Sequence, residues 1–478
     1  MRLTAEQKQA ARASATRVAV SAGAGTGKTT LLVGRVKWLV EDQLVDPSKI
    51  LVVTFTRRAC NELRERIDAP VDIETFHSAA LTGHPHEVYV LDEPEFRAVL
   101  DTARIDSKEL PEIQSQRLAE AAGEHTRNLK VDILRSYLSS QGKIDFLGLM
   151  ASMMLQSQDP LSKLRGYEHV LVDEAQDTDE YQFQILNNLE ANLFCVGDFR
   201  QSIYGWRGAT GDQFMQDAEV FHLTEGFRNP LDVTALANHV ASTFCDLEPV
   251  ASQTWACGAE IVPDLFPFLS DQLKLYAPED IAILTRTNRC QRKMVEYLEG
   301  QGIPTSEQQS SEVLKLLRFY LNPMSLASLP ETTIQPKWAE KRCRTSLEAW
   351  KLTHEDTVSS VLGKFIFKEC EKEKEWWNNQ YGDCRVLDAV NDYALSKSDL
   401  QPTPGVTVCT THQAKGLEWP VCFAIAEKPY QLTVEERQVW YVALTRASDR
   451  LFVTEFYGEV PLSKIIKEEL HARTDAKH

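Results

Sequence analysis

Short apolar runs and helix-like segments alternate along the first half of the chain. The runs RVAVSA (17–22), ILVVTFT (50–56), HVLVDEA (169–175) and LFCVGD (193–198) have the length and β-branched content of buried strands. Between them lie segments such as LLVGRVKWLVED (31–42), in which apolar residues recur with helical spacing. This alternation predicts an α/β fold with a mainly parallel sheet flanked by helices.

The same pattern returns in the second half, at DIAILTRTN (280–288), GVTVCTTHQAKGLEWPVCFAIAE (405–427) and RLFVTEFYG (450–458). Two stretches without clear strand runs interrupt it, one rich in helix formers and one rich in charge and tryptophan. We therefore expect two α/β domains, each with a mainly helical insertion. The expected segments are 1–77 with 151–225 (first domain), 78–150 (its insertion), 226–323 with 401–478 (second domain) and 324–400 (a reduced insertion).

Composition narrows the class of protein. Of the 478 residues, 43% are hydrophobic and 25% are charged, which excludes a mostly disordered chain. No stretch reaches the ~18 consecutive apolar residues of a membrane span, and the polar N-terminus lacks the apolar core of a secretory signal. We expect a cytoplasmic protein without membrane contact. Its ten cysteines form no CxxC pair, so no zinc ribbon is indicated.

The net charge is −17, from 69 acidic and 52 basic residues. This balance disfavours non-specific coating of nucleic acid, although it is compatible with a local basic track.

A glycine-rich loop follows the first predicted strand. It consists of Ala22, Gly23, Ala24, Gly25, Thr26, Gly27, Lys28, Thr29 and Thr30. Small residues let successive backbone amides surround a phosphate, and the following helix adds its positive N-terminal end. In such a loop Lys28 can reach the β and γ phosphates, and the Thr29 hydroxyl can coordinate magnesium. We expect a site for a nucleoside triphosphate and Mg²⁺ here.

The run LVDEAQD supplies the acidic complement of that loop. A carboxylate at a strand end can hold magnesium, and a second beside it can orient or deprotonate the attacking water. We assign Asp173 to the metal and Glu174 to the water. Together with the loop, these residues predict nucleoside triphosphate hydrolysis.

Further segments carry a family resemblance. They are LTAEQKQA, TFTRRACNEL, TFHS, VGDFRQSIYGWRGA, LTEGFRNP, TTHQAKGLEWP and YVALTRASDRL. In order, wording and spacing they closely resemble the UvrD/Rep type of superfamily 1A DNA helicase, from about residue 3 to residue 453. The resemblance implies two RecA-like P-loop domains and a compact member with a reduced second insertion.

Three residues gain a nucleotide-binding role from this resemblance. Gln7 would read the adenine edge and favour ATP over GTP. Phe227 would stack on the adenine, where the family more often has tyrosine, and Glu418 would contact the ribose.

Three others gain a role in hydrolysis. Gln201 would sense the γ phosphate and link it to the DNA track. Arg228 and Arg446 would be arginine fingers from the second domain, because a guanidinium offers planar donors to the charge that develops on the phosphoryl oxygens. Hydrolysis would then require the two domains to close.

A single strand would be held by aromatic stacking, which tolerates any base sequence, and by contacts to backbone phosphates. The predicted nucleic-acid residues are Thr54, Phe55, Thr75, Phe76, His77, Tyr204, Trp206, Arg207, Arg286 and His412. Stacking on bases does not distinguish ribose from deoxyribose, so RNA stays an alternative substrate.

The sequence as a whole predicts a monomeric or weakly associating ATP-dependent helicase. It would translocate on single-stranded DNA, act at duplex junctions and unwind duplex, and the resemblance implies 3′ to 5′ polarity. The residues identify no loading protein. One alternative is a translocase that displaces proteins with little unwinding, and another is a P-loop nucleotide switch that controls protein binding.

Overall fold

The computed structural model describes most of the chain. The described residues are 3–91, 93–106, 108–124, 128–205, 208–209, 211–254, 258–263, 265–306, 317, 334–336, 357–362, 365–367, 371–386, 389–390, 404–426 and 433–455. They form two compact units: unit 1 lies within 1–76, 154–307 and 402–478, and unit 2 lies within 77–153 and 308–401. Two of the predicted nucleic-acid residues, Trp206 and Arg207, lie outside the described residues.

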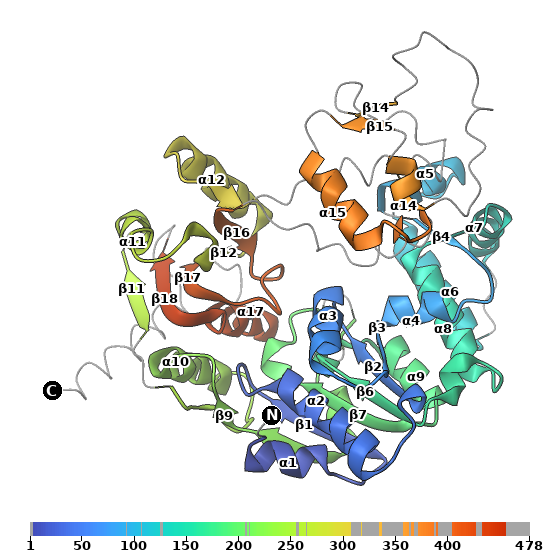
Figure 1. The fold of residues 1–478 in the computed structure, drawn as a ribbon, viewed down its shortest axis with the longest axis horizontal. Helices are drawn as coiled ribbons and strands as arrows, with labels where there is room; N and C mark the ends of the chain where they lie inside the picture. The colour runs from blue at the N-terminus through green and yellow to red at the C-terminus, as the bar shows by residue number, and fades with distance from the viewer. Residues whose placement is uncertain are drawn as a thin grey trace. The chain divides into compact units, whose positions relative to one another are not determined.

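The first six-stranded sheet of unit 1 is parallel throughout, with the order β3-β2-β6-β7-β1-β8 (Figure 1). Its strands are β1 (Arg17–Ala22), β2 (Ile50–Thr54), β3 (Asp72–Thr75), β6 (His169–Val172), β7 (Asn192–Gly197) and β8 (Glu219–Leu223). Because carboxyl ends of parallel strands share one edge, the loops after β1, β2, β6 and β7 meet there.

One face of this sheet is covered by α1 (Ala5–Ala11), α2 (Lys28–Lys37) and α3 (Arg57–Arg66). The shared core alternates along the strands, as the pleat requires: Val18 and Val20 of β1, for example, pack with Leu31 and Leu32 of α2. The helix α9 (Glu180–Asn188) follows β6 in the chain and begins with a capping box at Asp179.

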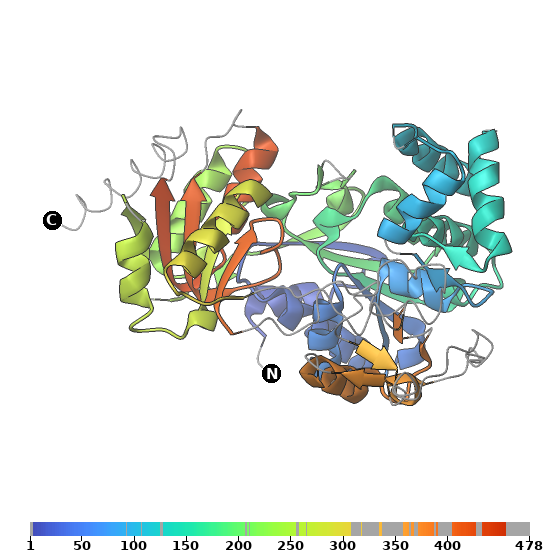
Figure 2. The ribbon, with the colours of Figure 1, turned by 90° about the horizontal axis from the view of Figure 1, so that it is seen from above.

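The second six-stranded sheet is also parallel, with the order β11-β18-β17-β12-β16-β13, and the arrows of its central strands run side by side in Figures 1 and 2. Its strands are β11 (Ala259–Val262), β12 (Ile281–Thr285), β13 (Thr305–Ser306), β16 (Val406–Thr410), β17 (Trp419–Ala426) and β18 (Ala447–Glu455).

Helices cover both faces of the second sheet. On one face α10 (Leu231–Ser242) and α17 (Val434–Leu444) pack on Ala282 and Leu284 of β12. On the other face α11 (Leu265–Gln272) and α12 (Asn288–Gly300) pack on Ile281 and Ile283 of the same strand. A strand that is buried on both sides reads as a continuous apolar run, which is how IAIL appears in the sequence.

Unit 2 is mainly helical. Its described helices are α5 (Glu93–Thr102), α6 (Leu110–Ala121), α7 (Leu129–Ser140), α14 (Val358–Leu362) and α15 (Glu371–Tyr381), together with nearly all of α4 (Phe76–Thr82) and most of α8 (Phe146–Gln158). Two-stranded pairings join β4 (Tyr89–Val90) to β5 (Lys143–Ile144) and β14 (Ile334–Pro336) to β15 (Phe365–Phe367). The fold class predicted from the sequence, two parallel-sheet α/β domains with mainly helical insertions, is confirmed.

The two insertions share one hydrophobic core. Trp377 and Leu362 of the second insertion are fully buried in the same cluster as Leu134 and Ile113 of the first. An ion pair joins Arg385 to Glu87 at 2.6 Å. The sequence pattern predicts that the two insertions belong to separate domains, and the assignment of the four segments to named domains stays a prediction.

Among the described residues, no helix combines the length and the apolar character that crossing a membrane would require.

Candidate nucleotide site and nucleic-acid interface

The loop between β1 and α2 adopts a conformation that only glycine supports. Gly25 and Gly27 have φ of 73° and 83°, in the left-handed region. A Cβ on Gly27 would lie 2.7 Å from the Gln7 side-chain nitrogen, and one on Gly25 would lie 2.8 Å from the Cβ of Arg228. The loop is therefore closely packed on both sides, and Thr26 donates a hydrogen bond across it to the Gly23 carbonyl at 2.9 Å.

Gln7 is held against this loop. It is buried, and its Nε2 donates to the Thr26 carbonyl oxygen at 2.9 Å. Its Oε1 accepts from the backbone amide of Thr4 at 3.1 Å in the capping box that begins α1. The local helix cap thus fixes the Gln7 amide beside the glycine-rich loop, and the adenine-reading role of Gln7 stays a prediction.

Two carboxylates follow β6. Glu174 has a φ of 50°, and its Oε1 lies 3.6 Å from Nζ of Lys28 at the start of α2. Burial and then the neighbouring Glu174 charge raise the pKa of Asp173 to about 7. Burial would also raise the pKa of Glu174, but the ammonium groups of Lys28 and Lys415 outweigh it, so that pKa lies below its ordinary value. The two carboxyl groups therefore lie side by side, with the ammonium groups of Lys28 and Lys415 as nearby positive charges.

A chain of hydrogen bonds runs from Glu174 toward Arg446, which lies just before β18 of the second sheet. Gln176 Nε2 donates to Glu174 Oε2 at 2.6 Å, and Gln176 Oε1 accepts from the backbone amide of Asp198 at 2.8 Å. Gln201 Nε2 then donates to Asp198 Oδ2 at 2.8 Å. The far end of the Gln201 amide, its Oε1, accepts from Arg446 at 3.0 Å.

Arg446 is almost fully buried in the turn between α17 and β18. Its Nε donates to the Val442 carbonyl at 3.0 Å and one terminal nitrogen donates to the Leu417 carbonyl at 3.1 Å. Burial, and then the charge of Arg228, lowers the pKa of Arg446 to about 9. The backbone contacts hold this guanidinium in one position, with its second terminal nitrogen toward Gln201.

Arg228 lies directly against the glycine-rich loop. The backbone amide of the preceding residue, Phe227, donates to the Gly25 carbonyl at 2.9 Å. One terminal nitrogen of Arg228 contacts Glu418 at 2.9 Å, whereas its buried Nε has no hydrogen-bond partner among the described residues. The Phe227 side chain is 48% exposed, so its ring is accessible to a ligand.

Helix α17 connects the second sheet with the loops of the first. The Tyr441 hydroxyl accepts from the Ala24 amide of the glycine-rich loop at 3.5 Å, and both residues lie in one small apolar cluster. Gln438 Nε2 donates to the Phe199 carbonyl at 2.8 Å. Lys415, in the loop before β17, forms an ion pair with Asp177 at 2.6 Å.

Three half-buried rings form a row that we call the aromatic strip: Phe55, Tyr204 and His412. Phe55 and Tyr204 are stacked, with ring centroids 5.5 Å apart and planes at 20°. Tyr204 and His412 have centroids 6.1 Å apart, and the Tyr204 hydroxyl donates to the His412 carbonyl at 3.2 Å. Residues that lie far apart in the sequence are thus brought together from both sheets.

Other predicted nucleic-acid residues have different surroundings. Phe76 is only 5% exposed, so the prediction that its ring stacks on a base does not fit this structure, in which the ring packs inside the protein. Thr54 and Thr75 are buried, and Thr54 Oγ1 has no hydrogen-bond partner among the described residues. His77 belongs to unit 2, where its ring meets Phe146 edge-on at 5.3 Å.

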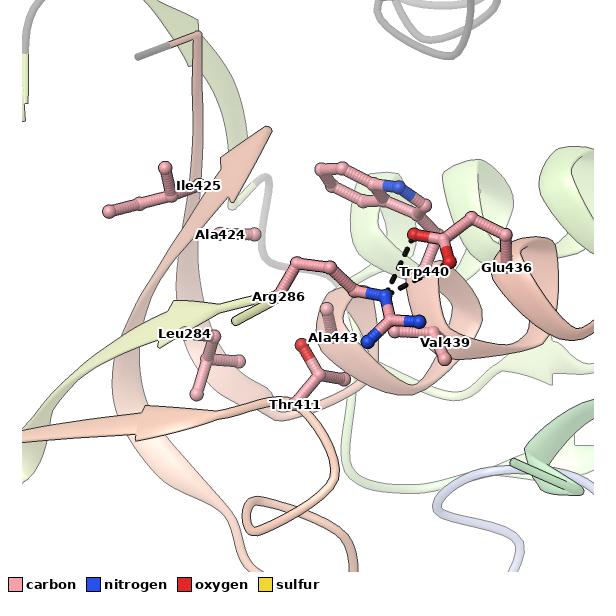
Figure 3. Close-up of a pocket in the computed structure, with 9 residues that line it drawn as sticks. All are labelled: Leu284, Arg286, Thr411, Ala424, Ile425, Glu436, Val439, Trp440 and Ala443. Atoms are coloured by element: carbon pink, nitrogen blue, oxygen red, sulfur yellow. Dashed lines mark hydrogen bonds and ion pairs between the residues drawn. The ribbon is translucent and has the colours of Figure 1, made fainter. Parts of the chain in front are cut away.

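Arg286 follows β12 and pairs with a carboxylate. Its Nε donates to both oxygens of Glu436, at 3.0 and 2.9 Å (Figure 3). Burial, followed by the positive charge of Arg286, lowers the pKa of the neighbouring His412 to about 4. Arg286 therefore lies near His412, at one end of the aromatic strip. Arg286 and Lys415 both place positive charge near this ring.

Comparison with known proteins agrees with this arrangement. Residues 7–207 match the family described as an AAA domain, and residues 364–457 match the UvrD-like helicase C-terminal domain. A probable DNA helicase II homolog of Mycoplasma genitalium is 24% identical over 595 aligned positions, which cover 94% of this chain and 84% of that protein. The ATP-dependent DNA helicases PcrA of Staphylococcus epidermidis and Leuconostoc citreum are each 24% identical, with 95% of this chain and 83% and 82% of theirs covered.

The chain belongs to the UvrD-like superfamily 1A helicases. It is therefore an ATP-hydrolysing helicase, as the sequence analysis predicted. Because the alignment with the Mycoplasma genitalium relative is longer than the 478 residues of this chain, that relative contains segments that this UvrD-like helicase lacks.

Several polar residues of this UvrD-like helicase were not singled out from its sequence. Gln176 and Asp198 link Glu174 to Gln201, and Lys415, between β16 and β17 of the second sheet, pairs with Asp177. The motifs DEAQD, GDFRQS and HQAKGLEW contain all of these positions. Their position in those motifs could have indicated a functional role. The residues that each of them contacts depend on tertiary structure and could not be read from the motifs.

Proposed function

We propose that this helicase hydrolyses ATP to move along single-stranded DNA in the 3′ to 5′ direction and to unwind duplex at the junction it meets. Three parts of this proposal go beyond family membership. They are single-stranded DNA as the substrate, the 3′ to 5′ direction of movement, and the coupling of hydrolysis to domain closure. The relatives named as DNA helicases support DNA as the substrate.

The nucleotide would bind at the glycine-rich loop, with Lys28 on its phosphates and Gln7 on its adenine. A divalent cation fits beside it, because burial and the Glu174 charge raise the pKa of Asp173, and a bound cation would favour the ionised carboxylate. Thr29 and Asp173 would hold magnesium, which when bound offsets the charge of the phosphate oxygens. Glu174 would orient the attacking water.

The observation that carries the coupling is the contact between Arg446 and Gln201. Arg446 extends from the second domain, whereas Gln201 follows β7 of the first, and their side chains meet at 3.0 Å. A γ phosphate bound near Gln201 would therefore be within reach of a guanidinium from the other domain. Separation of the domains would remove that guanidinium, so hydrolysis and closure would be linked.

Arg228 would supply the second finger. Its backbone packs on Gly25 of the phosphate loop, and its buried Nε lacks a partner among the described residues. A buried donor without a partner is unfavourable, and a phosphate oxygen would satisfy it. The present partner of the Arg228 terminal nitrogen, Glu418, is the residue we propose for the ribose, so nucleotide binding would rearrange this pair.

The single strand would lie along the aromatic strip. Its rings come from segments that also touch the nucleotide site: Tyr204 follows Gln201 by three residues, and Lys415 lies over the Tyr204 ring at 5.1 Å while pairing with Asp177. Domain movement driven by ATP would therefore change the spacing of the rings that grip the bases.

The decisive test is unwinding of duplexes that carry either a 3′ or a 5′ single-stranded tail, with ATP and magnesium. We expect strand separation from the 3′-tailed duplex only. Preference for the 5′ tail would overturn the polarity, and movement that displaces a bound protein without separating strands would identify a translocase instead. An ATP turnover rate that does not change when DNA is added would contradict the whole proposal.

A further inference from the structure

Arg286 and Glu436 form an ion pair at the border of the candidate strand-binding surface. Arg286 lies directly after β12, and Glu436 lies in the first turn of α17. The Arg286 side chain is 38% exposed and that of Glu436 is 13% exposed. The carboxylate is therefore held mostly inside the protein, while the guanidinium reaches solvent.

The recess around this pair is too small for a small-molecule ligand. Its volume is about 10 Å³, close to what one water molecule needs. Figure 3 shows Glu436 and Arg286 directed at each other, with the Trp440 ring beside them and Thr411 on the other side of Arg286. Any external partner of Arg286 must therefore approach from the solvent side.

Thr411 connects this recess with the aromatic strip. It lines the recess with Arg286 and immediately precedes His412, whose carbonyl accepts from Tyr204. A polynucleotide whose bases stack on the strip carries a phosphate at every nucleotide. At the border of the strip, such a phosphate would meet the same guanidinium that Glu436 now engages.

We propose that Glu436 is a positioning residue that occupies Arg286 in place of a backbone phosphate, and that Arg286 exchanges this carboxylate for a phosphate when the strand binds. This inference rests on the proposed function, since it requires a single strand on the aromatic strip. Arginine suits such an exchange, because its planar N–H groups can donate hydrogen bonds to the oxygens of either a carboxylate or a phosphate. The pair would thus limit strand affinity and allow release during each cycle.

The test compares Glu436→Gln with Glu435→Gln, in binding of a fluorescently labelled oligothymidylate without nucleotide. Both variants remove one negative charge from the first turn of α17, so the effect on the helix dipole is matched. Only the first removes the ion pair with Arg286. We expect Glu436→Gln to bind about two- to fivefold more tightly than Glu435→Gln, the range typical of a partly exposed ion pair.

Arg286→Ala, alone and combined with Glu436→Gln, completes a double-mutant cycle. In that background, Glu436→Gln should have no further effect on affinity, and the salt dependence of binding should fall by about one phosphate contact, a slope change of ~0.7 for a single strand. A merely structural role of Glu436 would instead weaken binding in both backgrounds.

The outcomes distinguish a failure of the proposed ion-pair exchange from a failure of the proposed helicase function. Equal affinity of the two glutamine variants, or a Glu436→Gln effect that persists without Arg286, would overturn the exchange and leave the helicase proposal standing. Absence of oligothymidylate binding by the unaltered protein would remove the proposed function and this inference with it.

Discussion

The nucleotide site and the aromatic strip differ in how their charged side chains are held. In the nucleotide site, Asp198 and Arg446 are at most 1% exposed, and each is fixed by several hydrogen bonds. Along the strip the rings are half-buried, and Arg286 at its border keeps 38% of its side chain exposed. Buried polar groups need complete partners, so Asp198 and Arg446 are held in place, whereas Arg286 can exchange partners.

This difference fits the two tasks we propose. Phosphoryl transfer gains most from donors that need no rearrangement when charge develops. Movement along a strand requires contacts that form and break in every cycle, which moderate and partly solvated interactions allow. Substitutions should accordingly act strongly on turnover in the first region and moderately on affinity in the second.

The largest effect is expected at Arg446. Arg446→Ala should reduce DNA-stimulated ATP turnover by about 10³- to 10⁵-fold, the range of arginine fingers. Steady-state kinetics with saturating ATP would measure it. Arg446→Lys keeps the charge but loses the fixed donor geometry, so it should stay close to the alanine variant. Arg437→Ala, in the preceding helix α17, is the control. A loss below tenfold in Arg446→Ala would contradict the finger role.

The second-largest effect is expected for Glu174→Gln. ATP turnover should fall by about 10²- to 10⁴-fold, because the glutamine side chain can no longer accept a proton from the attacking water. The amide has nearly the same shape and can still approach Lys28, so ATP affinity should be retained. Single-turnover hydrolysis and equilibrium nucleotide binding separate the two quantities. Substantial hydrolysis by this variant would assign the water to another residue.

On the strip, Phe55→Ala should weaken single-strand binding by about five- to 150-fold, which corresponds to ~1–3 kcal/mol for one stacked base. Fluorescence anisotropy of a labelled oligonucleotide measures this loss, while ATP affinity without DNA should not change. Phe55→Trp keeps a ring face and should restore binding. Equal losses of strand and ATP affinity would indicate that Phe55 supports the fold instead of the strand.

The same expectation applies to Trp206, which lies outside the described residues. Trp206→Ala should weaken strand binding and unwinding far more than nucleotide binding. A similar loss of ATP affinity would count against its stacking role.

The smallest effect concerns acid stability. His412 has a pKa of about 4 in the folded protein, against an ordinary value of 6.5, because burial and Arg286 disfavour the charged ring. Between these pH values the unfolded chain binds the extra proton, so stability should fall as pH decreases from about 6.5 to about 4. Urea unfolding of the protein and of His412→Gln should diverge across this window. Parallel pH profiles would contradict the buried, neutral ring.

The local motifs were predictable from the sequence for a physical reason. The loop from Ala22 to Thr29 and the pair Asp173–Glu174 depend on a short strand, a turn and a helix start, which neighbouring residues determine. The apolar runs likewise predicted the central strands, because burial on both faces leaves a continuous apolar signal.

Edge strands and long-range pairs were not predictable in this way. β3 (DIET) and β8 (EVFHL) alternate buried and accessible residues or lie largely exposed, so no apolar run marks them. The contacts of Arg446 with Gln201 and of Lys415 with Asp177 join positions more than 200 residues apart. The core around Trp377 likewise combines two insertions that the sequence separates.

The most direct test of the account is the rate of ATP turnover measured against the concentration of single-stranded DNA. The two-domain site predicts a steep rise that higher salt suppresses, since strand binding releases counterions and brings the arginines of the second domain to the phosphates. A turnover rate that stays constant across DNA and salt concentrations would contradict the coupling between the nucleotide site and the aromatic strip.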